Sequence, residues 1–145
     1  MAKAISLWQP WASLCVLGLK QYETRHWSTA YRGTLVIHAA KRPLTTSDQF
    51  MLITWKQQAF VDEDLIWELG HLPLFGAALG TVELTAIYHT DQLEPKISDK
   101  ELSFGNYEPG RYAWRLENPQ PFPKPIPYRG HQGMWEWDLP LLVEG

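Results

Sequence analysis

Residues 6–27, SLWQPWASLCVLGLKQYETRHW, place three tryptophans, a helix-like apolar stripe and the run Lys-x-x-Glu-x-Arg in one short piece of chain. From Trp11 to Gly18, apolar or small residues recur at i, i+3, i+4 and i+7, the spacing of one face of an α-helix. Pro10 suits the first turn of this helix, and Gly18 is placed to end it. Flat aromatic rings beside a lysine, a glutamate and an arginine favour a pocket for a planar, partly polar group such as a nucleobase.

Strand-like and helix-like segments follow this stretch in an irregular order. The predicted strands cover residues 3–7, 21–27, 34–40, 76–89, 110–118 and 133–139. The predicted helices cover residues 11–18, 43–60 and 61–70, and the second is expected to have Thr46 or Ser47 as its N-cap. Because helices do not regularly separate the strands, we expect an α+β fold with a curved, mixed sheet or a small open barrel.

Four segments carry a more specific expectation. Gly80, inside a predicted strand, indicates a bulge or a close backbone approach. Residues 90–109 are polar and contain Asp, Glu, Pro and Gly, so we expect a long loop there. Residues 119–127 contain five prolines in nine positions, so this segment must be extended and cannot be a central strand. Residues 129–133, RGHQG, contain two glycines that allow the backbone to approach a cleft closely.

Length and cysteine content set the broad class of the protein. The chain has 145 residues, close to the commonest size of a single domain, so residues 1–145 are expected to form one domain. The single cysteine cannot form an intrachain disulfide, which fits a reducing compartment. No segment approaches the roughly 20 apolar residues that a membrane span needs. We therefore expect a cytoplasmic protein that does not enter a membrane.

Charge is distributed unevenly along a chain whose net charge is −3. Residues 1–47 hold six basic side chains and one acidic one, residues 48–109 hold three and eleven, and residues 110–137 hold four and two. Six of the eight tryptophans lie in the two positive blocks. If these blocks meet in space, they form a positive face that attracts phosphates on an otherwise acidic protein. The alternatives are an ordinary scatter of surface charge and tryptophans that only fill the core.

Neither a metal site nor a cofactor site is indicated. The five histidines are dispersed, with no His-x-x-x-His or Cys-x-x-Cys spacing, so a zinc site is not expected. The sequence has no Gly-x-x-x-x-Gly-Lys-Ser phosphate loop, and no cofactor is expected. Cys15, on the apolar helix face, is expected to be a small buried hydrophobe rather than a nucleophile.

The run from Lys20 to Arg25 has two interpretations on its residues alone. In a strand, alternate side chains point to opposite faces, so Glu23 and Arg25 share one face and Tyr22 and Thr24 share the other. The two charged side chains could form an exposed ion pair that contributes under about 1 kcal/mol. On composition alone this ion pair is the favoured interpretation, and the alternative is that the two side chains line a binding site.

Several parts of the sequence together resemble a known family. They are residues 6–27, YRGTLVIHAAK at 31–41, GRYAWRLEN at 110–118 and GHQGMWEWD at 130–138. They resemble the ASCH domain family over nearly the whole chain. The most specific piece is residues 18–25, which match the family's Gly-x-Lys-x-x-Glu-x-Arg signature. The resemblance implies a PUA-like fold, a small mixed β-barrel flanked by short helices, with a cleft that binds RNA or another nucleic acid.

The resemblance also implies which side chains line that cleft, because the signature residues and their expected neighbours would face it. The expected ligand-binding residues are Gln9, Trp11, Lys20, Glu23, Arg25, Trp27, Arg32, Lys41 and Trp114. In this role indole rings stack on bases, the carboxylate and amide bind polar base edges, and basic side chains pair with phosphates. We therefore predict a non-catalytic module whose partner is RNA, another nucleic acid or a nucleoside, with an exposed or modified base as the preferred target.

One branch of the family suggests an alternative, an amidohydrolase acting on N4-acetylcytidine and similar N4-acylated cytosine nucleosides. Its small bacterial members use a lysine and a threonine of the signature and a glutamate on a later strand. Lys20 and Glu83 match the lysine and the glutamate and are the candidate catalytic residues, whereas Glu23 stands at the threonine's position. A protein-docking module without a nucleic-acid role is a third possibility, but it would leave the positive face unexplained.

Overall fold

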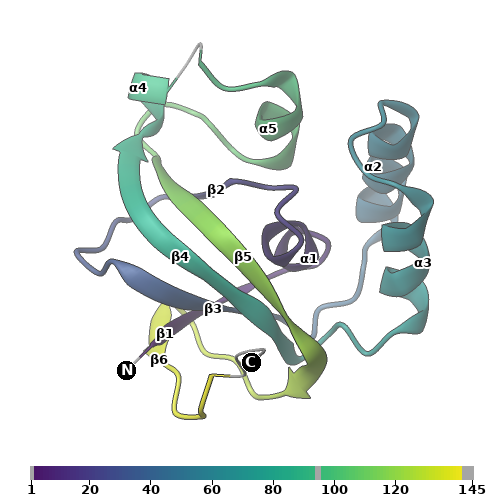
Figure 1. The fold of residues 1–145 in the computed structure, drawn as a ribbon. Helices are drawn as coiled ribbons and strands as arrows, with labels where there is room; N and C mark the ends of the chain where they lie inside the picture. Colours follow the sequence, from purple (N-terminus) through teal and green to yellow (C-terminus); the bar gives the residue numbers. More distant parts are fainter. Residues whose placement is uncertain (1, 94–95, 142–145) are drawn as a thin grey trace.

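The computed structural model describes residues 2–93 and 96–141, whose arrangement is shown in Figure 1. The helices are α1 (Trp11–Val16), α2 (Thr46–Gln57), α3 (Glu63–His71), α4 (Thr90–Leu93) and α5 (Asp99–Phe104). The strands are β1 (Lys3–Leu7), β2 (Tyr22–Arg25), β3 (Gly33–Ala39), β4 (Ala77–His89), β5 (Tyr112–Pro127) and β6 (Met134–Glu136). Of the expected domain, residues 1, 94–95 and 142–145 lie outside the described residues. Within the described part, no helix is long and apolar enough to span a bilayer.

The six strands form one mixed sheet in the order β2-β5-β4-β3-β1-β6. β1 and β3 are parallel, whereas the other neighbouring strands are antiparallel. The long strands β4 and β5 bend strongly, so the sheet curls into a half-barrel (Figure 1). This arrangement confirms the expected α+β class with a curved, mixed sheet.

A glycine lies at one of the points where β4 and β5 change register. The pairing shifts between Ala78 and Gly80, and a Cβ added at Gly80 would lie 2.4 Å from the carbonyl oxygen of Gln120. No side chain fits at that separation, so the close backbone approach expected of Gly80 is confirmed.

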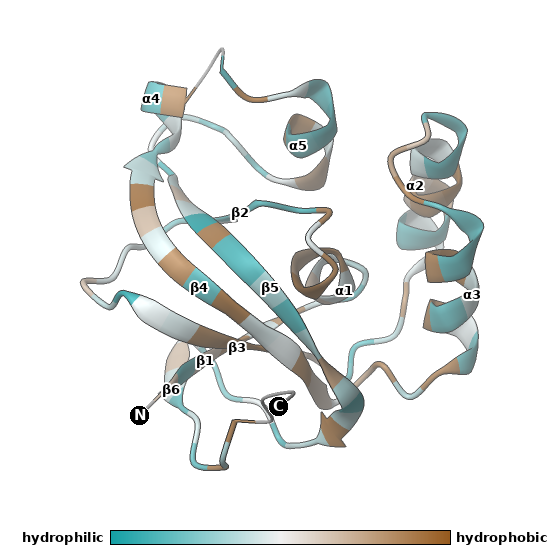
Figure 2. Cartoon of the chain, in the orientation of Figure 1, coloured by the Kyte–Doolittle hydropathy of each residue, from teal (hydrophilic) through white to brown (hydrophobic). Residues whose placement is uncertain are grey.

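α1 is buried on all sides. Ala12, Cys15 and Val16 pack into the main core against the sheet, while Leu14 belongs to a second cluster with residues of α2, α3 and α5. The sequence pattern predicted only one apolar face, but a helix that is apolar all round is buried all round. Figure 2 shows this strongly hydrophobic helix beside the sheet, with the α2–α3 pair farther out. Burial raises the pKa of the Cys15 thiol to about 12, as expected for a small buried hydrophobe.

Two sequence predictions about local structure were wrong. The N-cap of α2 is Thr45, whose hydroxyl accepts from the amide of Asp48 while the Asp48 carboxylate accepts from the amide of Thr45. This reciprocal capping box fixes the helix start one residue earlier than expected. Residues 90–109 are not one long loop, because they contain α4 and α5, and α5 begins with a Ser98 cap. The polar composition of this segment concealed that capping signal.

The proline-rich segment 119–127 is extended, as predicted, and continues β5 without a break. It pairs with β4 on one side, whereas β2 pairs only with Tyr112–Arg115, at the other end of β5. Proline lacks an amide hydrogen, so it is tolerated where a strand has a neighbour on one side only. The prediction that this segment cannot be a central strand is confirmed.

Candidate functional site

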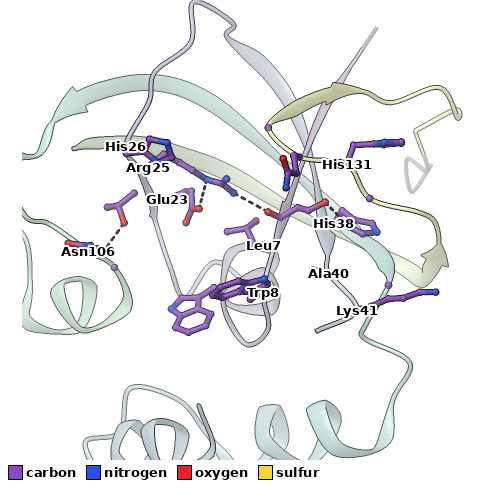
Figure 3. A pocket seen from close by; sticks show the side chains of 18 of the residues that line it. Leu7, Trp8, Glu23, Arg25, His26, His38, Ala40, Lys41, Asn106 and His131 are labelled. Atoms are coloured by element: carbon purple, nitrogen blue, oxygen red, sulfur yellow. Dashed lines mark hydrogen bonds and ion pairs between the residues drawn. The ribbon is translucent and has the colours of Figure 1, made fainter. Parts of the chain in front are cut away.

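A cleft of about 1540 Å³ opens where the carboxyl ends of the parallel strands β1 and β3 face β2 (Figure 3). Residues 103–106, at the end of α5 and just after it, line one side, and residues 127–133 line another. A Cβ added at Gly130 would lie 2.5 Å from the Ser6 hydroxyl, which shows how closely this backbone approaches the cleft floor. The close approach expected of the RGHQG segment is confirmed, and all five of its residues line the cleft.

β2 supplies a charged pair to the lining of the cleft. Arg25 Nε lies 2.8 Å from Glu23 Oε2, and the two side chains are only 19% and 11% exposed. Strand parity therefore places both side chains on one face as expected, but the pair is largely buried. Arg25 also donates from Nη2 to the backbone carbonyl of Ser6 at 3.0 Å. These bonds hold Glu23 as a fixed acceptor at the cleft wall (Figure 3).

Lys20 lies behind this pair rather than in the cleft. Its residue is 2% exposed, its Nζ lies 3.8 Å from Glu23 Oε1, and it donates to the backbone carbonyl of Tyr22. It is absent from the residues that line the cleft. The turn after α1, in which the amides of Leu19 and Lys20 both donate to the Leu14 carbonyl, directs the side chain inward. In this structure Lys20 is a buried partner of Glu23.

The expected aromatic and amide residues separate into two groups. Trp11 lines the cleft, with its ring edge-to-face with Trp55. Trp114 is 0% exposed and packs edge-to-face on Trp27 at 4.9 Å between ring centroids, and neither lines the cleft. Gln9 is also buried, and its side-chain amide is hydrogen-bonded to Ser13 and to the carbonyl of Leu74. The structure thus brings only Trp11 of these four to the cleft.

The basic residues of the cleft come partly from positions that the sequence analysis did not select. Lys41 lines it as expected, whereas Arg32 is exposed elsewhere and bonds the carbonyls of Thr29 and Tyr31. The lining holds four lysine or arginine side chains and one carboxylate, that of Glu23. The four basic residues are Arg25, Lys41, Arg111 and Arg129. The two positive sequence blocks therefore do meet, at this cleft.

A neutral histidine lies on the cleft floor beside Ser6. His38 Nε2 lies 2.7 Å from the carbonyl of Tyr128, and its Nδ1 lies 2.9 Å from the Ser6 hydroxyl. Because a carbonyl can only accept, Nε2 carries the proton and Nδ1 accepts from Ser6. Burial lowers the pKa of His38 below its usual 6.5, which favours this neutral form. His38 thus ties the cleft-lining segment 127–133 to the ends of β1 and β3.

A tryptophan that the sequence analysis did not single out is exposed at the cleft. Trp8 lines the cleft and is 55% exposed to solvent. The guanidinium carbon of Arg42 lies 4.0 Å from the centroid of the Trp8 ring. Arg42 in turn pairs with Asp48 at 3.0 Å. No sequence signal distinguished Trp8 from Trp11, since both flank Gln9-Pro10.

The two candidate catalytic residues are not brought together. Glu83 lies on β4 between two buried residues, so its side chain points away from the face on which α1 packs. Its Oε1 accepts from the Thr34 hydroxyl at 2.9 Å. Among the described residues no hydrogen bond or ion pair joins it to Lys20, whose ionic partner is Glu23. No group of three potential metal ligands is found in residues 2–93 and 96–141.

Hydrogen bonds connect the segment that carries α5 to Thr24 of β2 and to Gln21 just before it. The Glu101 carboxylate accepts from the amide of Gln21, and the amide of Asn106 donates to the Thr24 hydroxyl at 3.0 Å. Arg111 bonds the Thr24 carbonyl at 3.2 Å. Glu101 is buried, and burial raises the pKa of its carboxyl group above the usual 4.5. These bonds fix the side of the cleft formed by residues 103–106.

Comparison with known proteins agrees with this architecture. The sequence model of the ASCH domain family matches residues 5–126. Activating signal cointegrator 1 of Homo sapiens is 30% identical over 135 residues, and the same protein of Mus musculus is 28% identical over 135 residues. Each alignment covers 92% of this chain and 22% of the relative, so the chain spans about a fifth of the length of these relatives.

A solved structure shows the same fold. The crystal structure of ASCH from Zymomonas mobilis superposes with a TM-score of 0.55 at 19% identity, covering 94% of this chain and 87% of that chain. At this identity the likeness supports the fold alone. It confirms the expected PUA-like architecture of a small mixed barrel with short helices.

Proposed function

Because the chain belongs to the ASCH domain family, we propose that its cleft binds single-stranded RNA, or an exposed base within RNA, without catalysing a reaction. The observation that supports this most is the lining of the cleft. Four basic side chains and one carboxylate surround it on a protein whose net charge is −3. Such a local positive field attracts a polyanion even when the whole protein repels it.

The proposed roles follow from position. Lys41 and Arg129 are exposed at the cleft and have no ion-pair partner among the described residues, so they are available to phosphates. Glu23 is a fixed acceptor suited to an exocyclic amino group of a base. Trp11 offers an apolar ring surface at the cleft wall. The Arg25 guanidinium holds Glu23 in place and adds positive charge to the cleft lining.

The experiment is a salt titration of RNA binding with matched lysine variants. Lys41→Gln should weaken binding of a single-stranded oligonucleotide and reduce the slope of log K against log salt by about 0.7, the value for one phosphate contact on a single strand. Lys124→Gln is the control, because Lys124 is also an exposed lysine but does not line the cleft. Equal affinity and equal slope for the wild type and Lys41→Gln would contradict the proposed interface.

The amidohydrolase alternative stays a prediction. It is tested by following release of cytidine from N4-acetylcytidine, with Glu83→Gln as the variant that should abolish turnover. Turnover that Glu83→Gln leaves intact would exclude Glu83 from catalysis, and no turnover by the wild type would exclude this substrate.

A further inference from the structure

Three side chains beside the cleft form a continuous stack that neither the family signature nor the expected lining includes. Asp48 Oδ2 pairs with Arg42 Nη1 at 3.0 Å. The Arg42 guanidinium carbon lies over the Trp8 ring, 4.0 Å from its centroid, well within the range of a cation–π contact. Trp8 then lines the cleft.

The far end of this stack is fixed in the protein. Asp48 is buried, and the same Oδ2 that binds Arg42 accepts from the amide of Thr45 at 2.9 Å within the capping box of α2. Arg42 is therefore held by a carboxylate that cannot move without breaking the start of α2. A guanidinium held in this way restricts the movement of the indole over which it lies.

Trp8 and Arg42 differ in their relation to the cleft. Trp8 lines the cleft and is 55% exposed, whereas Arg42, which covers one face of its ring, is not a lining residue. The ring face that Arg42 does not cover is therefore the one left for a ligand in the cleft. Figure 3 shows the Trp8 ring at the lower edge of the cleft, below Glu23, with Lys41 farther to the right.

We propose that the free face of Trp8 is a stacking subsite for one nucleobase of a single-stranded RNA, with Arg42 and Asp48 as positioning residues; this inference rests on the proposed function. A ring whose movement is already restricted loses less conformational freedom when a base stacks on it. Stacking tolerates any base, because every base has a π face. Lys41, adjacent in sequence to Arg42 and also at the cleft, is placed to take the phosphate of the same nucleotide.

The test separates the base from the phosphates. Binding is measured for a ten-nucleotide oligoadenylate RNA and for an abasic oligomer of the same length and charge. Trp8→Ala should weaken oligoadenylate binding roughly 5- to 150-fold, the range for loss of one base–aromatic stack, without changing the salt slope. Its affinity for the abasic oligomer should equal that of the wild type. Trp67→Ala is the matched control, because Trp67 on α3 is 54% exposed but is absent from the cleft lining.

Arg42→Ala distinguishes positioning from direct phosphate binding. If Arg42 only orients Trp8, the variant weakens oligoadenylate binding less than Trp8→Ala does, and the salt slope is unchanged. A slope reduced by about 0.7, with equal loss for the abasic oligomer, would make Arg42 a phosphate contact and overturn its positioning role. Trp8→Phe, which keeps a ring and preserves the fold, should retain more affinity than Trp8→Leu.

The outcomes separate this subsite from the proposed function. If Trp8→Ala and Trp8→Leu bind oligoadenylate as the wild type does while Lys41→Gln binds it more weakly, the subsite is overturned and the RNA interface stands. If the wild type binds neither oligomer, both are overturned. Equal losses for both oligomers in Trp8→Ala would also contradict stacking, because the abasic oligomer has no base to stack.

Discussion

Replacing Lys20 by methionine should destabilise the fold without changing the number of phosphates bound. The Lys20 ammonium lies 3.8 Å from Glu23 Oε1 and donates to the Tyr22 carbonyl, and both charged residues are buried. Methionine fills the volume of the aliphatic stem but leaves the carboxylate and the carbonyl short of a partner. Removing one partner of a buried ion pair costs about 3–5 kcal/mol. Because Glu23 keeps Arg25, we expect the lower end, about 3 kcal/mol, a large part of the 5–15 kcal/mol typical of a domain.

Urea denaturation followed by circular dichroism measures this loss, and Lys3→Met is the control. Lys3 pairs with Glu136 at 3.1 Å on the surface, so its loss should cost less than about 1 kcal/mol. An unchanged urea midpoint for Lys20→Met would refute the argument that Lys20 is a structural cation. A reduced salt slope of RNA binding with unchanged stability would assign Lys20 to phosphate contact, as the family signature implies.

Two further predictions concern stability. Gly80→Ala should lower the free energy of unfolding by roughly 1–3 kcal/mol or more, because its Cβ would lie 2.4 Å from the Gln120 carbonyl oxygen. Gly70→Ala in α3 is the control and should be neutral or stabilising by up to about 1 kcal/mol, because no atom lies within 4 Å of the new Cβ. Equal thermal midpoints for the two variants would contradict this prediction. Burial raises the pKa of Glu101 in the folded state, so its ionisation disfavours the fold, and stability present below pH 4.5 is lost as the pH rises through the folded-state pKa. Glu101→Gln should therefore gain in unfolding free energy relative to the wild type between pH 4 and pH 7 in urea titrations, and a constant difference across that range would argue against a raised pKa.

Patterns local in sequence predicted the architecture well. Glycine and proline positions, strand parity and helix spacing depend on short-range stereochemistry, so the start of α1 and the shared face of Glu23 and Arg25 could be inferred directly, whereas α1 ends two residues earlier than predicted. The errors arose where a local signal was weak or concealed. The capping box of α2 lies one residue before the expected N-cap, and the Ser98 cap lies inside a segment whose composition is typical of a loop.

The membership of the cleft could be predicted only in part. Sequence proximity cannot distinguish a tryptophan in the core, such as Trp114, from one at the cleft, such as Trp8, because the difference depends on which distant segments cover each ring. The same holds for Lys20, which is buried although charged. The clustering of basic residues was predictable, because it needed only the two positive blocks to meet.

The hydrogen bond from Arg25 to the Ser6 carbonyl connects the cleft to the open side of the half-barrel. β2 is one edge of the sheet, and β6 pairs with β1 only from Lys3 to Ile5, so the Ser6 carbonyl is left for a side chain from the opposite edge. The Arg25 guanidinium thus joins two parts of the sheet that hydrogen-bonded strands would join in a closed barrel. An anion that draws Arg25 away from Ser6 would break this contact between the two parts of the sheet. Any change in the Arg25–Ser6 bond on binding would therefore link occupancy of the cleft to the contact between these two parts of the sheet.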